Sequence, residues 1–567
     1  MAKHTDRVRI EEVDWRAVFP WVRLFGAFKM AAEPGKLLTS LLLVVMLYLM
    51  AMVIDPLAGR QVHPGELAYY RAVQEGVIAP AALERWTATH ELRERAALEQ
   101  LLKQTSGIRD EVHELVESSD RLKLVRKELR DHYAKAYADV ETDRKQTGFA
   151  KDWEKDLAAV RLARQQALAR IDAMTMRRPL MVAADQMMDA TDRLARSLVT
   201  FNLGWTQTVQ ARARMAQAAA GSMASAAAGD DELIASDAIL PLSDPTTTVA
   251  ALRDLFVVIP GWLWHHHRGP LLLWLLLALP AVALLGGAVA RMAAAHATRD
   301  ERLSLREAMR FVQPRFLAFV LTPLMPLAIV LAVAALMSAG GFVIFNPPAW
   351  GIDILGGLLF GIAILCGFII AAALLLTAMG IHLVYPAAAV NGSDVFDAIA
   401  RAFNYVLNRP WRWLFYNAIA IFYGALTYLF LLLVIMLAAW ATQRFVGQWV
   451  FTTTDLGANR FETILPAQGL STWQSSIDYA SLDWSGRVSA FLVHCWMGLL
   501  LAVLPAYLVS YYLSVNTWIY TLLRRDADGI ELEDLLVDPP FDPHAVPKAA
   551  EPAQDAAKDD DDEDAQG

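Results

Sequence analysis

The sequence predicts an all-α polytopic integral membrane protein with about six transmembrane helices and a helical hairpin insert outside the membrane. Of 567 residues, 56% are hydrophobic and 20% are charged, whereas soluble domains are on average less apolar and more charged. Several long runs contain no charged residue at all. A helix needs about 20 apolar residues to cross a hydrocarbon core ~30 Å thick, and these runs reach that length.

Six charge-free runs define the expected spans. The first lies between Lys36 and Asp55, and the last lies between Arg487 and Arg524. The expected spans are residues 37–54, 270–290, 316–338, 354–380, 413–440 and 490–522. The last five form an expected transmembrane domain over 269–525. A re-entrant loop at 340–350, where Gly340 and Gly341 precede two prolines, stays open as an alternative to a plain interfacial loop.

Basic residues near the spans predict the orientation of the chain. Seven Lys and Arg residues lie in 1–36 and six lie in 291–315, whereas 339–350 contains none. Such residues concentrate on the cytoplasmic side of membrane proteins. Both termini are therefore expected in the cytoplasm, with residues 55–268 outside.

The segment 1–36 is expected to be a cytoplasmic amphipathic segment. Aromatic and aliphatic residues alternate there with Arg16, Arg23 and Lys29, which suits a helix lying in the membrane interface. A helix packed on the bundle is the open alternative. The charge-rich start predicts that 37–54 is an uncleaved anchor and not a signal peptide.

Residues 55–268 read as an extracytoplasmic helical insert. Apolar residues recur every three or four positions over 107–146 and again over 153–174, with a turn signal at Thr147 and Gly148. This spacing predicts an antiparallel, coiled-coil-like hairpin, and Pro179 is expected to begin a third helix. The apolar positions are Ile108, Val112, Leu115, Leu122, Leu129, Tyr133, Ala136 and Val140, then Trp153, Leu157, Val160, Ala167, Ile171 and Met174, then Leu180, Ala184, Met187, Leu194, Leu198 and Phe201.

Two stretches look like copies of one another. Ser304 and Ser393 are N-cap candidates, each followed by acidic residues that favour a helix start. Each stretch then reaches a proline, Pro314 or Pro410, beside a basic and an aromatic residue. Spans two and three would then repeat as spans four and five, as in some transporter folds. Convergence is the alternative, because cytoplasmic loops generally favour basic and aromatic residues.

The second copy carries a resemblance. Its motifs are Tyr385-Pro386-Ala-Ala-Ala-Val, Phe396-Asp397-Ala398 and Arg409-Pro410-Trp411, and the later stretch 510–529 adds Ser-Tyr-Tyr-Leu-Ser-Val-Asn-Thr and Arg-Arg-Asp-Ala-Asp-Gly. Over roughly 290–535 the chain resembles uncharacterised bacterial polytopic proteins similar to the membrane domain attached to some glycerophosphodiester phosphodiesterases. The resemblance implies a protein of the bacterial cytoplasmic (inner) membrane. It supplies no catalytic residue.

The motifs of common enzymes are missing from the sequence. Cys366 and Cys495 are too few for a disulfide scaffold or a cysteine-ligated zinc site, and no phosphate-binding glycine loop or Gly-x-Ser-x-Gly elbow occurs. His90-Glu91 and His113-Glu114 lack the second His of a zinc protease helix. We therefore expect no catalytic, cofactor-binding or metal residue, no cofactor and no nucleic-acid partner. The run His265-His266-His267 reads as interfacial, with metal or anion binding as the alternative.

A few polar residues inside or at the ends of the expected spans remain as candidate functional residues, because polar groups in a membrane are costly and usually functional. They are His494, His382, Asn417, Asn516 and Asp353. Gly357 and Gly361 are expected to allow close helix packing.

The C-terminal segment 526–567 is expected to be an acidic, disordered cytoplasmic tail. It carries 15 acidic residues against two lysines, so the remaining residues sum to +4 within a total charge of −9. Solvation is the simplest role of such a composition, and binding of a basic partner is the alternative.

These features predict a non-enzymatic membrane protein that organises membrane or envelope through its insert. Its expected partners are the lipid bilayer and, through 107–202, an envelope protein or a second copy of itself. A permease or lipid-handling carrier built on spans two to six is the alternative. An enzyme acting at the membrane comes third, and a polar cluster around His494 or His382 would favour it.

Overall fold

The computed structural model describes most of the chain, and its elements are helical throughout that part. Besides the helices, these residues contain an isolated antiparallel β-bridge between Val62 and Arg177. The all-α class is therefore confirmed for these residues. The described residues are 19–57, 61–63, 65–74, 90–104, 121–147, 153–204, 246–345, 352–450, 461, 464 and 482–536.

Six helical stretches of the described chain are long and apolar enough to cross a membrane. The number agrees with the six charge-free runs, and each stretch contains or largely covers the expected span. They are α3 (Pro34–Leu57), α14 to α15 (Arg268–Arg299), α16 to α18 (Leu305–Phe342), α19 to α20 (Gly356–Asn391), α22 (Pro410–Gly447) and α24 (Trp484–Asp528).

Several of these stretches change helix type or direction along their length. Within them, the structure has α14 (Arg268–Ala281), a π-helical turn (Val282–Gly286), α15 (Gly287–Arg299), α16 (Leu305–Val312), α17 (Phe316–Leu321), α18 (Met325–Phe345), α19 (Ile352–Gly380), a 3-10 turn (Ile381–Leu383) and α20 (Val384–Asn391). The amphipathic α21 (Val395–Asn408) joins α20 to α22.

The remaining helices belong to the N-terminal segment and the insert. They are a 3-10 turn (Pro20–Phe25), α2 (Gly26–Ala31), α4 (Glu66–Gln74), α6 (His90–Gln104), α8 (Arg121–Thr147), α9 (Trp153–Met174), α10 (Pro179–Val199), α12 (Thr248–Arg253), a π-helical turn (Asp254–Val258) and α13 (Ile259–His266).

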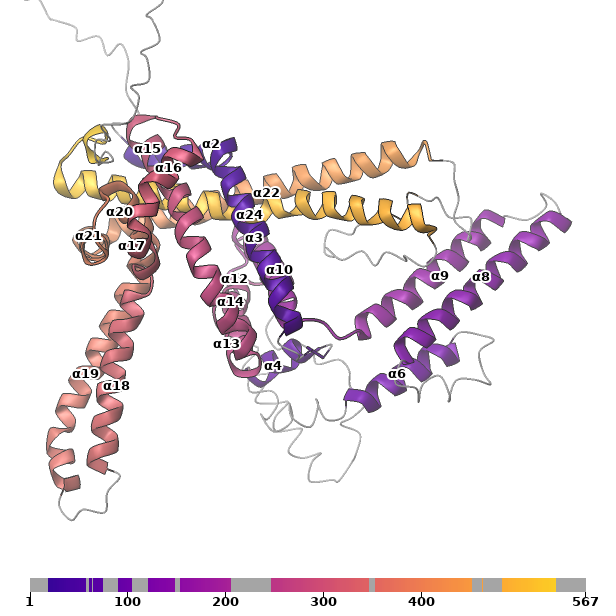
Figure 1. Cartoon of the computed structure of the whole chain (residues 1–567), viewed down its shortest axis with the longest axis horizontal. Helices are drawn as coiled ribbons and strands as arrows, with labels where there is room; N and C mark the ends of the chain where they lie inside the picture. Colours follow the sequence, from indigo (N-terminus) through magenta and orange to yellow (C-terminus); the bar gives the residue numbers. More distant parts are fainter. Residues whose placement is uncertain are drawn as a thin grey trace, which may run out of the picture.

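The six apolar stretches diverge from one shared region, which we call the hub: α2, α15, α16, α20, α21 and the C-terminal part of α24. Three limbs leave it, namely α18 with α19, α3 with α14, and α22 with α24 (Figure 1). The hub brings together the ends of the long helices that the basic residues predict to lie on one side of the membrane. His296 at the end of α15 contacts Glu33 before α3, Arg315 donates to Gly392 O, and Arg412 at the start of α22 pairs with Asp526.

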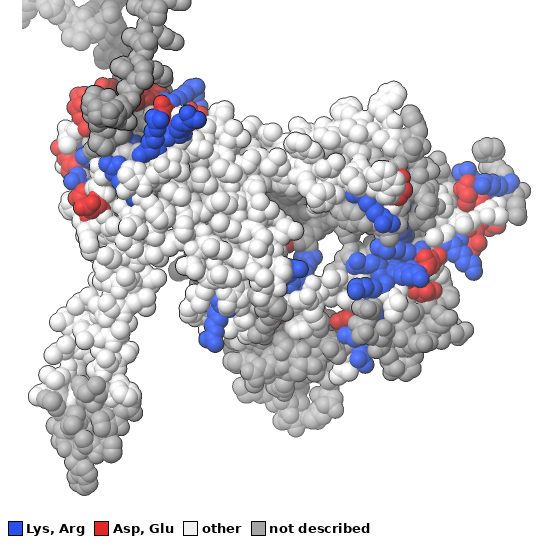
Figure 2. Space-filling view, in the orientation of Figure 1, with Lys and Arg blue, Asp and Glu red and all other residues white. Residues whose placement is uncertain are grey.

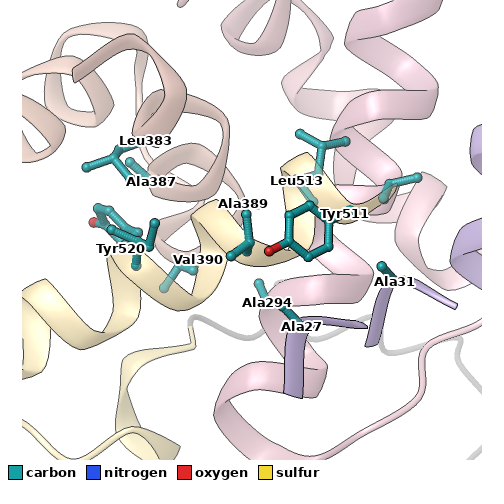
Figure 3. Packing of buried hydrophobic residues seen from close by; sticks show 14 of the residues in the cluster. Ala27, Ala31, Ala294, Leu383, Ala387, Ala389, Val390, Tyr511, Leu513 and Tyr520 are labelled. Carbon is teal, nitrogen blue, oxygen red and sulfur yellow. The ribbon is translucent and has the colours of Figure 1, made fainter. Parts of the chain in front are cut away.

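The hub packs through many small side chains. Ala27 and Ala31 of α2, Ala294 of α15 and Ala389 of α20 are buried in the same apolar cluster as Tyr511 (Figure 3). Small residues let helix backbones approach closely, so the helices of the hub pack at short distances. The N-terminal segment therefore packs on the bundle: Tyr423 donates to Phe25 O at 3.0 Å and Ser510 donates to Ala31 O at 2.8 Å.

The limb of α18 and α19 is apolar and largely exposed, since the two helices pack mainly on each other. The prediction that Gly357 and Gly361 pack closely on another helix is not met within the described chain. No atom outside the helix backbone lies within 4 Å of a Cβ built on either glycine. The loop at 346–351, on which the re-entrant alternative depends, lies outside the described residues.

The two similar stretches take the same succession of elements. α15 ends at the left-handed Asp300 (φ 54°), and α20 ends at the left-handed Gly392 (φ 61°). A short amphipathic helix follows each, α16 after the first and α21 after the second. The long apolar α22 comes directly after α21, whereas a 3-10 turn and the short α17 precede the long apolar α18 in the first copy. Ser304 forms a full capping box with Glu307, whereas the second copy begins at Asp394 instead of Ser393. The two copies pack on each other through α15 and α20.

In the insert, α8 and α9 lie side by side and share an apolar seam (Figure 1). Leu129, Leu157, Ala167 and Ile171 are buried there as the spacing predicted, and Val125 joins them. The part of the expected seam at 107–120 lies outside the described residues, as do 216–228 and the tail from 537.

The face of α10 differs from the expected one. Leu180 is buried and Met187 and Leu198 are partly buried, but Ala184 is exposed and Phe201 is 72% exposed. The reason is that α10 does not extend the α8–α9 pair. It packs on α3, α12 and α22, so a different face, with Ala183, Ala190 and Ala195, is buried.

Candidate functional site

The five polar candidates from the sequence do not form one cluster. His494 is exposed on the half of α24 that lies away from the hub, whereas Asn516 is buried near the hub. At 1.5 Å per residue the two lie roughly 33 Å apart along this helix. Asp353 lies in the first turn of α19, and its side chain is outside the described set.

His382 and Asn417 do meet, through one tryptophan. Trp413 Nε1 donates to His382 Nε2 at 3.3 Å, and Asn417 Nδ2 donates to Trp413 O at 2.9 Å. These bonds join the turn after α19 to the first turns of α22. Buried polar side chains need such hydrogen bonds. His382 and Asn417 therefore help to hold the end of α19 against the start of α22.

A buried polar cluster at the outer end of the α3 limb is instead built around Glu66 of α4. Its Oε1 accepts from Trp262 Nε1 at 3.0 Å and from His267 Nε2 at 3.1 Å, and its Oε2 accepts from His63 N at 3.3 Å. Burial raises the pKa of Glu66, but the hydrogen bonds from His267 and Trp262 outweigh burial and hold the pKa below its usual range. Glu66 is therefore a carboxylate that ties α4 to α13 and the start of α14.

A second carboxylate, Asp254, lies beside this cluster and joins two more elements. It is paired with Arg71 of α4 and Arg193 of α10, each at 3.0 Å, and it is almost fully buried. Buried charges persist where they are paired and hydrogen-bonded. Asp254 thus fixes α4 and α10 on the π-helical turn before α13.

The hub has its own polar clusters. Glu33 accepts a hydrogen bond from Lys36 and contacts His296 Nδ1 at 3.0 Å, with Arg302 at 3.5 Å. Burial raises the pKa of Glu33, yet Lys36 and His296 lower it by more, so the net direction is down. This cluster joins the start of α3 to the end of α15.

The second hub cluster lies where α20 meets α24. Arg524 donates to Asn391 Oδ1 and to Leu535 O, and Asn391 Nδ2 contacts Tyr520 Oη at 2.7 Å. The Asp-Ala-Asp-Gly motif serves the same junction, because Tyr405 donates to Asp528 at 2.6 Å and Gly529 ends α24 with φ 69°. Gly suits this left-handed position.

These clusters join helices and do not converge on a cavity. Among the residues that the structure describes, no three His, Cys, Asp or Glu side chains come together as metal ligands. The cavity recorded there, about 260 Å³, lies at the outer end of α22 and is lined by Trp440, Gln443, Arg444, Gly447 and Gln448.

Comparison with known proteins brings no relative to this chain: no family model, no curated protein and no solved structure matches it.

The sequence contained only weak signals for the outer cluster. His267 belongs to the run His265-His266-His267, but no residue of the run stands out in the sequence, and the pairing of His267 with Glu66 crosses about 200 residues of chain. Glu66 and Asp254 lie in a charged insert where most acids are solvated, so spacing alone could not single them out.

Proposed function

We propose that this chain is a non-enzymatic integral membrane protein that organises the membrane or envelope through its insert. One observation carries the proposal. The α8–α9 pair extends away from the apolar limbs (Figure 1), and α10, which follows it in the chain, packs on α3 and α22. Such a projection offers a long surface for contact with another protein.

The projecting pair has the make-up of a contact surface. An apolar seam holds α8 to α9, with α6 packed on it through Leu98, Leu101 and Leu102. Outside the seam the helices are charged, as Figure 2 indicates for this part of the molecule. The expected partner is an envelope protein or a second copy of this chain, bound along a coiled-coil-like surface.

The base of the insert is held to the limbs by buried polar pairs. Glu66 with His267 joins α4 to the residue just before α14, and Asp254 with Arg193 joins α10 to the π-helical turn before α13. A firm connection would let a contact made by α8 and α9 position the apolar limbs in the bilayer. The bilayer is the bacterial inner membrane in this proposal, with the hub and both termini in the cytoplasm.

The test uses the full chain beside a variant that lacks 121–174, with a short Gly-Ser linker in place of α8 and α9. Both proteins are expected to enter the membrane, and photo-crosslinkers at exposed positions of α6 are expected to capture a specific partner, or a second copy, only in the full chain. Equal crosslinking and equal membrane distribution of the two proteins would contradict the proposal.

A permease or lipid-handling carrier is the second candidate. Its support is the repeated succession of elements around Asp300 and Gly392, whose copies pack together in the hub. Parallel repeats of this kind occur in transporters. Proteoliposomes of the full chain that move neither labelled phospholipid nor small solutes above the rate of empty vesicles would remove this candidate.

A further inference from the structure

The exposed face of α16 is basic. Ala308, Phe311 and Val312 are the buried residues of this helix, which packs on α15, and Arg306 and Arg310 are exposed. The two arginines are four residues apart, so they are neighbours on the helix surface. Neither side chain makes a hydrogen bond or an ion pair within the described part of the chain. Figure 2 shows basic side chains gathered at the hub, where α16 lies.

Arg315 lies beside this face, in the 3-10 turn Gln313–Arg315 that follows α16. Its Nη1 donates to Phe311 O at 3.2 Å and its Nε donates to Gly392 O at 3.1 Å. Its guanidinium lies 4.4 Å from the centre of the Phe311 ring, and that of Arg291 lies 3.8 Å from the same ring. These contacts hold Arg315 next to α16 without neutralising it, because no carboxylate pairs with Arg315 among the described residues.

Two of the three acids in this stretch already have partners. Glu307 accepts hydrogen bonds from the N and Oγ atoms of Ser304, each at 2.8 Å. Asp300 Oδ1 lies 3.3 Å from His296 Nε2. Residues 299–315 contain five arginines and three acids, so the stretch has a surplus of positive charge that its own acids do not balance.

Exposed apolar surface begins directly after the basic face. Leu317 of α17 is 67% exposed, and Leu321 and Leu324 are exposed as well. They lead into the uncharged surface of the α18–α19 limb (Figure 2). Basic residues followed by exposed leucines match the order of headgroup and acyl chain in a leaflet. A free phosphate ion would contact only the arginines, whereas a phospholipid would contact both parts.

The matching helix of the second copy, α21, has no such face. Its arginine, Arg401, pairs with Asp397 at 2.8 Å. The exposed side chains of α21 and of the start of α22 include the apolar Phe396, Leu407 and Trp411. The basic face therefore does not arise merely because a short amphipathic helix precedes an apolar one at the hub.

We propose that the face formed by Arg306, Arg310 and Arg315 binds the headgroup phosphate of an anionic phospholipid, whose acyl chains lie along Leu317 and Leu321. Guanidinium groups suit phosphate because they offer paired N–H donors in one plane. Basic clusters on amphipathic helices beside membrane spans bind anionic headgroups. The site requires that the apolar stretches cross the bilayer and is independent of any role of the insert, so the two proposals fail separately.

The test places a bimane label on Leu321→Cys in the full chain, with Cys366 and Cys495 replaced by serine. The protein is reconstituted in dioleoylphosphatidylcholine vesicles with increasing fractions of phosphatidylglycerol brominated on its acyl chains, since bromine quenches the label on contact. Equally brominated phosphatidylcholine is the reference lipid. Quenching is expected to show at least fivefold tighter binding of phosphatidylglycerol, which is about the gain from one arginine near an anionic surface.

Arg306→Gln combined with Arg310→Gln should reduce this preference to about that of the reference lipid. Arg401→Gln combined with Arg409→Gln is the matched control, because it removes the same charge at the second copy, and it should keep the preference. Added NaCl should weaken the preference of the unsubstituted face, since salt screens exposed charges. This measurement needs no substitution of the arginines, so it tests the site even where those variants fail to fold.

Equal quenching by the two lipids, or a preference that NaCl leaves unchanged, would overturn the proposal. So would a preference that survives in Arg306→Gln with Arg310→Gln, or that the control pair loses equally. Excess inorganic phosphate should leave the preference unchanged, and its loss would assign the face to a free anion. A preference that appears only after removal of 537–567 would assign the face to the acidic segment of the chain and not to lipid.

Discussion

Asp55, two residues before the end of α3, caps a helix that begins more than 120 residues later: its carboxylate oxygens accept from Leu180 N at 3.1 Å and from Met181 N at 3.2 Å. The residue at the N-cap position of α10 is Arg178, whose side chain makes no capping bond. The acid at the end of the first apolar stretch thus supplies the missing acceptor, which joins the insert to α3.

We expect Asp55→Ala to lower the free energy of unfolding by about 1 kcal/mol, with a range of roughly 0.5–2 kcal/mol, because loss of an N-cap acceptor costs that much. Chemical unfolding in detergent micelles measures it. Asp185→Ala, at a half-exposed position of the same helix, is the control and should change little. Equal losses in both variants would show that Asp55 does not act as a cap.

Glu66 is expected to make stability depend on pH on the acid side. Its pKa is lowered in the folded protein, so the unfolded state binds the proton more readily and the stabilisation is present above the ordinary value of 4.5. It is lost as pH falls from 4.5 through the lower folded pKa. Melting temperatures over this window should fall more steeply for wild type than for Glu66→Gln. Parallel curves would contradict this role.

Asn391→Ala should destabilise the hub by about 1–3 kcal/mol, because it leaves Arg524 and Tyr520 without their buried partner. Thermal unfolding of the purified chain is the measurement. The control is Asn408→Ala, whose amide bonds Asn404 on the exposed surface. A loss no larger than that of the control would mean that the cluster contributes nothing.

Two glycines of the same helix should respond in opposite ways to alanine. A Cβ on Gly380 would lie 2.2 Å from Phe403 Cδ1, whereas a Cβ on Gly361 meets nothing within 4 Å. We expect Gly380→Ala to cost about 1–3 kcal/mol by overpacking and Gly361→Ala to be neutral or slightly stabilising. If Gly361→Ala is the more harmful change, a partner covers that face of α19.

The positions of the long helices follow from the sequence because a membrane crossing needs a continuous apolar run, and charge is easily counted. The residues that join them do not follow in this way. Asp254 and Glu66 resemble the solvated acids of the insert in their local sequence, and only the packing of α10 on the turn before α13, or of α4 on α13, distinguishes them. The buried face of α10 was mispredicted for the same reason, since its neighbours are spans and not α9.

The gathering of six helix ends in one hub predicts that the hub and the α8–α9 pair lie on opposite sides of the membrane. Single cysteines at Lys127 of α8 and at Arg306 of α16, both exposed, can be introduced after Cys366 and Cys495 are replaced by serine. In intact spheroplasts, a membrane-impermeant maleimide should label Lys127→Cys at once and Arg306→Cys only after permeabilisation. Labelling of both before permeabilisation, or of Arg306→Cys alone, would contradict the account.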